Sequence, residues 1–368
     1  MTSPASASHN LALPLPGDLR PQIRLGCAFD RLAEIPDDSI DCIVTSPPYW
    51  ALRDYGVAGQ LGLEPTLAEH IDTAVRYCRE LRRVLKPTGT FWLNYGDSYA
   101  SGVNGRSAAD TKAAGGDDRT FRDKPFSTVG PIGSDAAGGR LKAKDLCMVP
   151  NRLAIALQDD GWWVRSEIIW AKRNPMPESA KDRPSGAHEK IFLLTKNARY
   201  FYDHAAVRIG SVPDTTEPVR LPPLAHLKNP RGLDPAHERG GHNHTGIDRI
   251  GRGSRGLRNW EPIPAQERVG PSVWDIATRA FRAAHFATFP PELAARCILA
   301  GCPEGGLVLD PFGGAGTTGL VAARLQRRSV LIELTADYAD LARERIHADA
   351  PLLMIEPMAP PAAKAGAA

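Results

Sequence analysis

The chain has 368 residues, of which 42% are hydrophobic, and its formal net charge is +3. This apolar share suffices for a packed core and excludes wholesale disorder, and the sequence has no run of about 18 apolar residues that would span a membrane. The small net charge excludes a global attraction to nucleic acid, so a nucleic-acid surface would have to be a local basic patch. No basic segment precedes an apolar run near residue 1, so a cytoplasmic protein is expected.

The cysteines are scattered and form no C-x-x-C pair. This spacing argues against a disulfide framework or a structural zinc site, so no metal is expected. The ordinary role of such residues in a cytoplasmic chain is that of small buried apolar side chains. They are Cys27, Cys42, Cys78, Cys147, Cys297 and Cys302.

The first part of the chain predicts alternating strands and helices. Residues 1–20, like residues 351–368 at the other end, are an Ala/Pro/Ser-rich tail expected to be disordered. An apolar run at residues 40–44 predicts a strand that leads into a pair of prolines. Apolar positions at helical spacing predict a helix over about 67–85, which a Lys-Pro-Thr-Gly turn ends before a strand over 90–94.

The middle of the chain alternates between ordered and loop-rich segments. Residues 101–140 have few large apolar side chains and predict a mobile loop or insertion. A helix near 150–158 and strands over 163–170 and 190–195 are typical of a continuing α/β sheet. Residues 203–270 are rich in Pro, Gly, His and Arg and lack an amphipathic pattern.

Within that last segment lies a basic run. Five arginines and one aspartate give residues 239–258 a local charge of +4 (5 − 1), interleaved with glycines. One interpretation is a solvated loop; the other is a flexible basic segment that contacts DNA phosphates and base edges. The arginines are Arg239, Arg249, Arg252, Arg255 and Arg258.

The C-terminal third predicts a strand, a glycine loop, a helix and a second strand. The first strand covers residues 307–310, the helix 319–325 and the second strand 329–332, which ends at Glu333. Glycines between a strand and a helix let the backbone approach a ligand closely. An acidic residue about 20 positions later commonly accepts hydrogen bonds from ribose hydroxyls. A tight turn without ligand is the alternative. The loop lacks the Gly-Lys-Ser/Thr of a phosphate-binding loop and the G-x-G-x-x-G of a nicotinamide site.

A second motif follows the strand at residues 40–44. Pro47 and Pro48 stiffen the backbone and lack N–H donors, so this loop presents acceptors only. Ser46 and a backbone carbonyl could therefore face the hydrogens of an amino group, and the ring of Tyr49 offers a face for base stacking. The alternative is a proline-rich turn with a packed aromatic ring.

Together, Thr45-Ser46-Pro47-Pro48-Tyr49 and Asp310-Pro311-Phe312-Gly313-Gly314-Ala315-Gly316-Thr317 resemble the catalytic and S-adenosylmethionine motifs of DNA amino-methyltransferases. The catalytic motif comes first, which is the permuted order of the beta group. The resemblance covers about residues 23–347. It implies an α/β, Rossmann-like S-adenosylmethionine-dependent methyltransferase fold with circularly permuted motif order and an inserted loop-rich target-recognition region.

The resemblance also divides the chain and assigns roles. Residues 21–202 would be the catalytic half, 203–270 the target-recognition region and 271–350 the cofactor-binding half. The implied catalytic residues are Ser46, Pro47, Pro48 and Tyr49. The implied cofactor-binding residues are Asp310, Pro311, Phe312, Gly313, Gly314, Gly316, Thr317, Thr318, Glu333, Phe289 and Pro290. The implied DNA-binding residues are Arg249, Arg252, Arg255, Arg258, Lys172 and Asn174. One departure is Cys27, where the family often has an acid near the cofactor adenine; Asp30 is a candidate substitute.

The implied reaction is methylation of an exocyclic amine in a base flipped out of double-stranded DNA. A serine at the first motif position favours cytosine N4, with adenine N6 as the alternative. The resemblance leaves open a companion restriction endonuclease and a homodimer. A protein or small-molecule methyltransferase would place the N-P-P-Y motif after the cofactor loop. A nuclease built on His242-Asn243-His244 lacks a metal scaffold, and a non-catalytic DNA-binding module leaves both motifs unexplained.

Overall fold

The computed structural model describes most of the predicted elements. The predicted insertion at residues 101–140, the four arginines assigned to DNA and most of the predicted target-recognition region lie outside the described residues. The described residues are 12–50, 60–100, 141–142, 144–175, 178, 180–207, 270–278 and 289–349.

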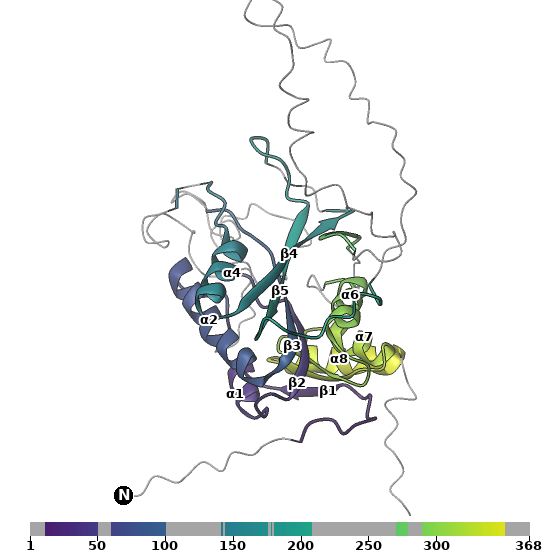
Figure 1. The fold of residues 1–368 in the computed structure, drawn as a ribbon. Coiled ribbons are helices and arrows are strands. Elements are labelled where there is room, and N and C mark those ends of the chain that lie inside the picture. The colour runs from purple at the N-terminus through teal and green to yellow at the C-terminus, as the bar shows by residue number, and fades with distance from the viewer. Residues whose placement is uncertain are drawn as a thin grey trace, which may run out of the picture. The chain divides into compact units, whose positions relative to one another are not determined.

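The described residues form an eight-stranded sheet with the order β1-β8-β7-β2-β3-β5-β4-β6 (Figure 1). All neighbouring strands are parallel except that β5 is antiparallel to both β3 and β4. The strands are β1 (Gln22–Leu25), β2 (Ile40–Thr45), β3 (Leu85–Tyr95), β4 (Trp163–Lys172), β5 (His188–Thr195), β6 (Val273–Ile276), β7 (Leu307–Asp310) and β8 (Arg328–Glu333).

Helices cover both faces of the sheet (Figure 1). On one face lie α1 (Ala28–Ala33), α2 (Leu67–Val84) and α4 (Val149–Asp159); on the other lie α6 (Pro291–Gly301), α7 (Thr317–Arg324) and α8 (Ala336–Asp349). This arrangement confirms the predicted α/β class.

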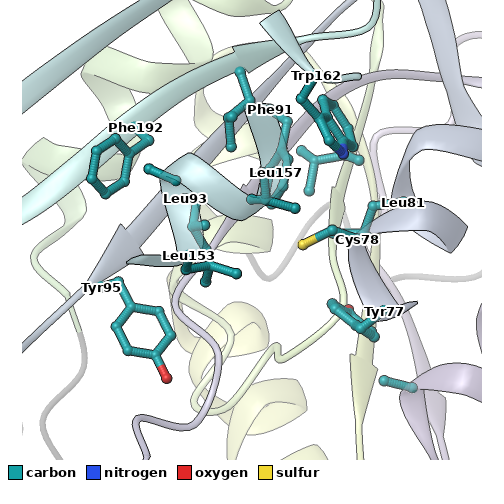
Figure 2. Close-up of a cluster of buried hydrophobic side chains, with 14 of the residues drawn as sticks. Tyr77, Cys78, Leu81, Phe91, Leu93, Tyr95, Leu153, Leu157, Trp162 and Phe192 are labelled. Atoms are coloured by element: carbon teal, nitrogen blue, oxygen red, sulfur yellow. The ribbon is translucent and has the colours of Figure 1, made fainter. Parts of the chain in front are cut away.

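Each face has its own core because successive residues of a strand point to opposite sides. Ile43 and Leu309 belong to the first cluster, whereas Val44 and Val308 belong to the second. Figure 2 shows side chains of α2, β3 and α4 that gather in the first cluster. Five of the six cysteines are buried, as predicted, and Cys27 is partly exposed.

The helix starts follow from local sequence. Thr66 accepts a hydrogen bond from the backbone N–H of Glu69, whose carboxylate in turn accepts from the Thr66 N–H, so a capping box begins α2. A proline in the first turn begins both α4 and α6, where its missing N–H costs no hydrogen bond.

Two features of the fold differ from the predictions. The Lys-Pro-Thr-Gly segment at residues 86–89 is part of β3, because β3 begins directly after α2 and pairs with β2 through an irregular register near Ile40. The short elements β1, α1 and β6 were not predicted, because four to six residues are too few for a clear hydrophobic period. The longer helices α6 and α8 were not predicted either. Among the described residues, no helix is long and apolar enough to cross a bilayer.

Candidate functional site

The two sequence motifs meet at one edge of the sheet. The chain continues from β2 to β3 on one side and from β7 to β8 on the other, so the strand order reverses between the adjacent strands β2 and β7. Ligands of open α/β sheets bind beyond the carboxyl ends of the strands at such a switch point. The Ser-Pro-Pro-Tyr loop follows β2 and the glycine loop follows β7, so both border this position.

The catalytic motif is tied to neighbouring strands by side-chain hydrogen bonds. Ser46 Oγ donates to Tyr49 Oη (3.0 Å), and Tyr49 Oη donates to Oε2 of Glu189 on β5 (2.8 Å). Nδ2 of Asn94 on β3 donates to Tyr49 Oη (3.0 Å) and to the same Glu189 oxygen (3.0 Å). Lys172 Nζ on β4 lies 2.6 Å from Glu189 Oε1. The motif therefore belongs to a network that reaches three strands beyond β2.

Burial, followed by the charge of Glu189, raises the pKa of the Tyr49 phenol well above its ordinary value. The phenol therefore stays protonated at neutral pH. A Cβ at Gly96 would lie 2.6 Å from Cε2 of the Tyr49 ring, so only glycine leaves room for the ring at this place.

A second, buried set of polar groups supports the loop from behind. Nε2 of His70 lies 2.6 Å from Tyr95 Oη, and its Nδ1 lies 2.8 Å from Glu64 Oε2. Tyr95 Oη also accepts from the backbone N–H of Trp50 (3.2 Å) and lies 3.4 Å from the Pro48 carbonyl. These contacts fix the backbone on both sides of Tyr49.

Asp310 joins the two motifs. Its Oδ1 accepts from Thr45 Oγ1 (2.7 Å) and from the backbone N–H of Phe312 (3.1 Å), and its Oδ2 accepts from Thr318 Oγ1 (2.6 Å). Burial raises the pKa of this carboxyl to about 6, although these hydrogen bonds oppose the shift. Asp310 therefore bonds to the residue just before Ser46 and to the first turn of α7.

In the glycine loop, backbone conformation and close packing require glycine. Gly316 has a φ of +76°, and a Cβ there would lie 2.9 Å from Cβ of Ala342 on α8. Arg345 of α8 donates to the Ala315 carbonyl (3.0 Å) and to Thr317 Oγ1 (2.9 Å). Helix α8 thus holds the loop from outside.

Glu333 closes the loop from the end of β8. Its Oε2 accepts from the Gly314 N–H (2.9 Å), and its Oε1 accepts from the backbone N–H and the hydroxyl of Thr335 (3.0 Å each). A carboxylate has about four acceptor positions, so these contacts among the described residues leave one for a ligand hydroxyl.

Other predicted site residues occupy varied positions. Phe289 packs against the second core cluster, and Pro290 is the N-cap of α6. Asn174 bonds to the backbone of Thr278 through both its amide nitrogen (3.1 Å) and its amide oxygen (2.8 Å). Cys27 is the N-cap of α1 and makes no side-chain capping bond.

The sequence did not point to Asn94 or Glu189. Asn94 is the last residue of the predicted strand 90–94, and Glu189 lies one residue before the predicted strand 190–195. Neither has a local motif, and only the antiparallel course of β5 brings its first residues to the edge where the parallel strands end.

Comparisons with known proteins agree with this geometry. The family model of N6/N4-type methyltransferases, described as DNA methylase, matches residues 40–344. The chain belongs to this family. It is 40% identical over 346 residues to the Type II methyltransferase M.XycI of Xanthomonas campestris pv. cyanopsidis, covering 94% of each chain. It is 40% identical over 327 residues to M.SmaI of Serratia marcescens, covering 88% of this chain and 90% of that one.

Among solved structures, the PvuII DNA methyltransferase (cytosine-N4-specific) aligns with a TM-score of 0.54 and 17% identity, over 91% of this chain and 94% of its own. This likeness concerns the fold alone. Family membership confirms the predicted DNA methyltransferase activity, with S-adenosylmethionine as the methyl donor.

The residues at the glycine loop fit that donor. Glycine backbone gives close access, and Glu333 keeps one acceptor position for a ribose hydroxyl. The ring of Phe312 packs against Tyr77 of α2 (centroids 5.1 Å apart), and the buried Tyr77 hydroxyl has no hydrogen-bond partner among the described residues. A nucleoside bound beside Phe312 and Tyr77 would offer acceptor atoms for the Tyr77 hydroxyl hydrogen.

Proposed function

We propose that this DNA methyltransferase transfers the methyl group to the exocyclic N4 of cytosine in a flipped-out base. The observation that carries the proposal is the orientation of Ser46 at the switch point. Its hydroxyl hydrogen is directed at Tyr49 and one lone pair accepts a long hydrogen bond from Asn94 Nδ2 (3.4 Å), so the other lone pair is available to accept from an amino group. The preference for cytosine N4 over adenine N6 rests on the family resemblance, in which the Thr-Ser-Pro-Pro-Tyr form of the motif is the one most often linked with N4 methylation.

The acceptors of the loop would prepare the amine for reaction. The lone pair of an exocyclic amine is delocalised into its ring, which makes the nitrogen a poor nucleophile. Hydrogen bonds from the amine to Ser46 Oγ and the Pro47 carbonyl would favour a pyramidal nitrogen with an available lone pair. The ring of Tyr49, positioned by Glu189 and Asn94, would stack on the flipped base.

The chain's role toward the donor is positioning. When bound, S-adenosylmethionine supplies an electrophilic sulfonium methyl group. Glu333 would accept a ribose hydroxyl, while the glycines of the loop admit the nucleoside and Phe312 flanks it. Because Asp310 bonds to both motifs, it would hold the donor site at a fixed distance from Ser46, and orientation of this kind accelerates transfer strongly.

The DNA contacts are proposed from sequence and charge. Residues 203–270 would recognise the target site, with Arg249, Arg252, Arg255 and Arg258 contacting phosphates or bases. Lys172 and Asn174 would line the base pocket. M.XycI and M.SmaI are Type II methyltransferases, which supports a role for this chain in protecting DNA from a companion restriction endonuclease.

Mass spectrometry of nucleosides tests the proposal. Unmethylated DNA of varied sequence is incubated with the protein and isotopically labelled S-adenosylmethionine, then digested to nucleosides. The expected product is labelled N4-methylcytosine. Labelled N6-methyladenine would overturn the base assignment and keep the site, whereas absence of both, with donor binding verified by calorimetry, would overturn the proposal.

A further inference from the structure

A directed chain of hydrogen bonds leads away from Ser46. The Ser46 hydroxyl donates to the Tyr49 hydroxyl, which donates to Glu189 Oε2. Tyr49 Oη also accepts from Asn94, so its one donor and two acceptor positions are all used. Each hydroxyl therefore donates to the next group, from the proposed position of the amine to the carboxylate of Glu189.

Glu189 is placed to carry a negative charge. Its side chain is only 16% exposed, and the ammonium of Lys172 on β4 stabilises the carboxylate through Oε1. The other described groups that face it are the phenol of Tyr49 and the uncharged amide of Asn94 on β3; the Tyr95 phenol lies behind Tyr49, with ring centroids 4.8 Å apart. Oε2 is thus the acceptor at the end of the chain.

We propose that Glu189 is the terminal proton acceptor of methyl transfer, reached through the hydroxyls of Ser46 and Tyr49. The inference rests on the proposed function, because it takes the target amine to be bound at Ser46. It applies equally to cytosine and adenine, since both amines lose one proton when methylated.

The step balances. The amine nitrogen forms a bond to the methyl carbon, and the carbon–sulfur bond breaks with its electron pair remaining on sulfur. The nitrogen loses a proton to Ser46 Oγ, Ser46 passes its own proton to Tyr49 Oη, and Tyr49 passes its own to Glu189 Oε2. The positive charge of the sulfonium and the negative charge of Glu189 disappear together.

Among the described residues of this loop, 46–50, none other than Tyr49 carries a titratable side chain. Pro47 and Pro48 carry no titratable group, and Asp310 is bonded to Thr45, Thr318 and the Phe312 N–H on the far side of the motif. A newly methylated exocyclic ammonium is a strong acid because deprotonation restores conjugation with the ring. A chain of hydroxyls that ends in a carboxylate removes this proton without an exposed path to water.

Isosteric replacement tests the proposal. Glu189→Gln keeps the size and an acceptor oxygen but is not a proton acceptor. The matched control is Glu167→Gln: Glu167 lies on β4 and pairs with Lys190 (2.6 Å), but none of its described contacts involves Ser46 or Tyr49. Single-turnover methylation is measured with saturating labelled S-adenosylmethionine and unmethylated DNA, and donor affinity by calorimetry.

General-base contributions of this kind are typically about 10²- to 10⁴-fold, so Glu189→Gln is expected to slow methylation by at least about 10²-fold with donor affinity unchanged. Glu167→Gln is expected to match the wild type. Equal rates in the two variants would overturn the proposal. Wild type that labels no DNA base would instead overturn the proposed function, so the two failures are distinguishable.

Chemical rescue separates proton transfer from mere support of Tyr49. Glu189→Ala opens space beside Tyr49 Oη, and added formate is expected to restore methylation at least tenfold while added chloride does not. Equal effects of the two salts would contradict proton transfer.

Tyr49→Phe serves as a second test if Glu189→Ala fails to bind S-adenosylmethionine. This variant interrupts the chain of hydroxyls and leaves Glu189 intact. A single-turnover rate within threefold of wild type would overturn the relay.

Discussion

The loops after β2 and β7 satisfy their polar side chains in opposite ways. In the glycine loop, Thr317 and Thr318 bond to Arg345 and Asp310, so what remains for a ligand is glycine backbone and one acceptor position on Glu333. In the Ser-Pro-Pro-Tyr loop, the side chains are bonded into a chain that ends on another strand. On the proposed function, the first arrangement fixes the shape of the donor site and the second gives the acceptor site a route for a proton.

The largest expected effect comes from a change in the Ser-Pro-Pro-Tyr loop, which would bind the target amine. Ser46→Ala removes the hydroxyl that would accept from the amine and start the relay. Loss of one such oriented group in an active site costs about 10²- to 10³-fold, so we expect a fall of this size in the single-turnover rate. Donor affinity by calorimetry should stay within about twofold of wild type. A parallel loss of donor binding would mean that the two loops do not form separate sites.

The converse change lies at the site for the methyl donor. Glu333→Ala removes the free acceptor position and also the partner of the Gly314 N–H. An unmade hydrogen bond to a charged group costs about 1.5–3 kcal/mol, so donor affinity is expected to fall about 10- to 100-fold. Calorimetry measures this loss, and the single-turnover rate at saturating donor should remain near wild type. A rate loss that saturating donor does not restore would contradict the assignment.

Asp310 tests the connection between the loops through pH. Burial raises its folded-state pKa to about 6 from an ordinary 3.8, so protonation favours the folded state. This contribution, at most about 3 kcal/mol, is fully present below pH 3.8 and is lost as the pH rises through about 6.

Asp310→Asn is neutral at every pH and should lack this contribution. The melting temperature of the wild type, followed by calorimetry, is therefore expected to fall relative to that of the variant between about pH 4 and pH 6. Parallel curves would show that Asp310 stays ionised throughout this range.

The smallest effect lies far from both loops. Thr66→Ala removes the N-cap of α2 and is expected to lower the free energy of unfolding by about 1 kcal/mol. Denaturant titration measures this loss. Methylation rate and donor affinity should not change. A change in either would mean that the stability of α2 affects the structure of the site.

Sequence predicted those parts of the molecule that are contiguous in the chain. The strands at β2, β7 and β8 and the helix α2 have clear hydrophobic patterns, and each loop motif lies within about eight residues. Glu189, Asn94 and His70 were not predicted, because their contacts with Tyr49 and Tyr95 join residues that lie 25 to 140 positions apart in sequence. Their proximity is a property of sheet order.

The reversed direction of β5 also bears on how this protein can diversify. Its first residues enter the sheet where the other strands leave it, so Glu189 is held by pairing opposite Trp170 rather than by a connecting loop. Loops at that edge can change in length or composition without displacing the carboxylate. A scaffold of this kind permits new target sequences to evolve around an unchanged chemical centre.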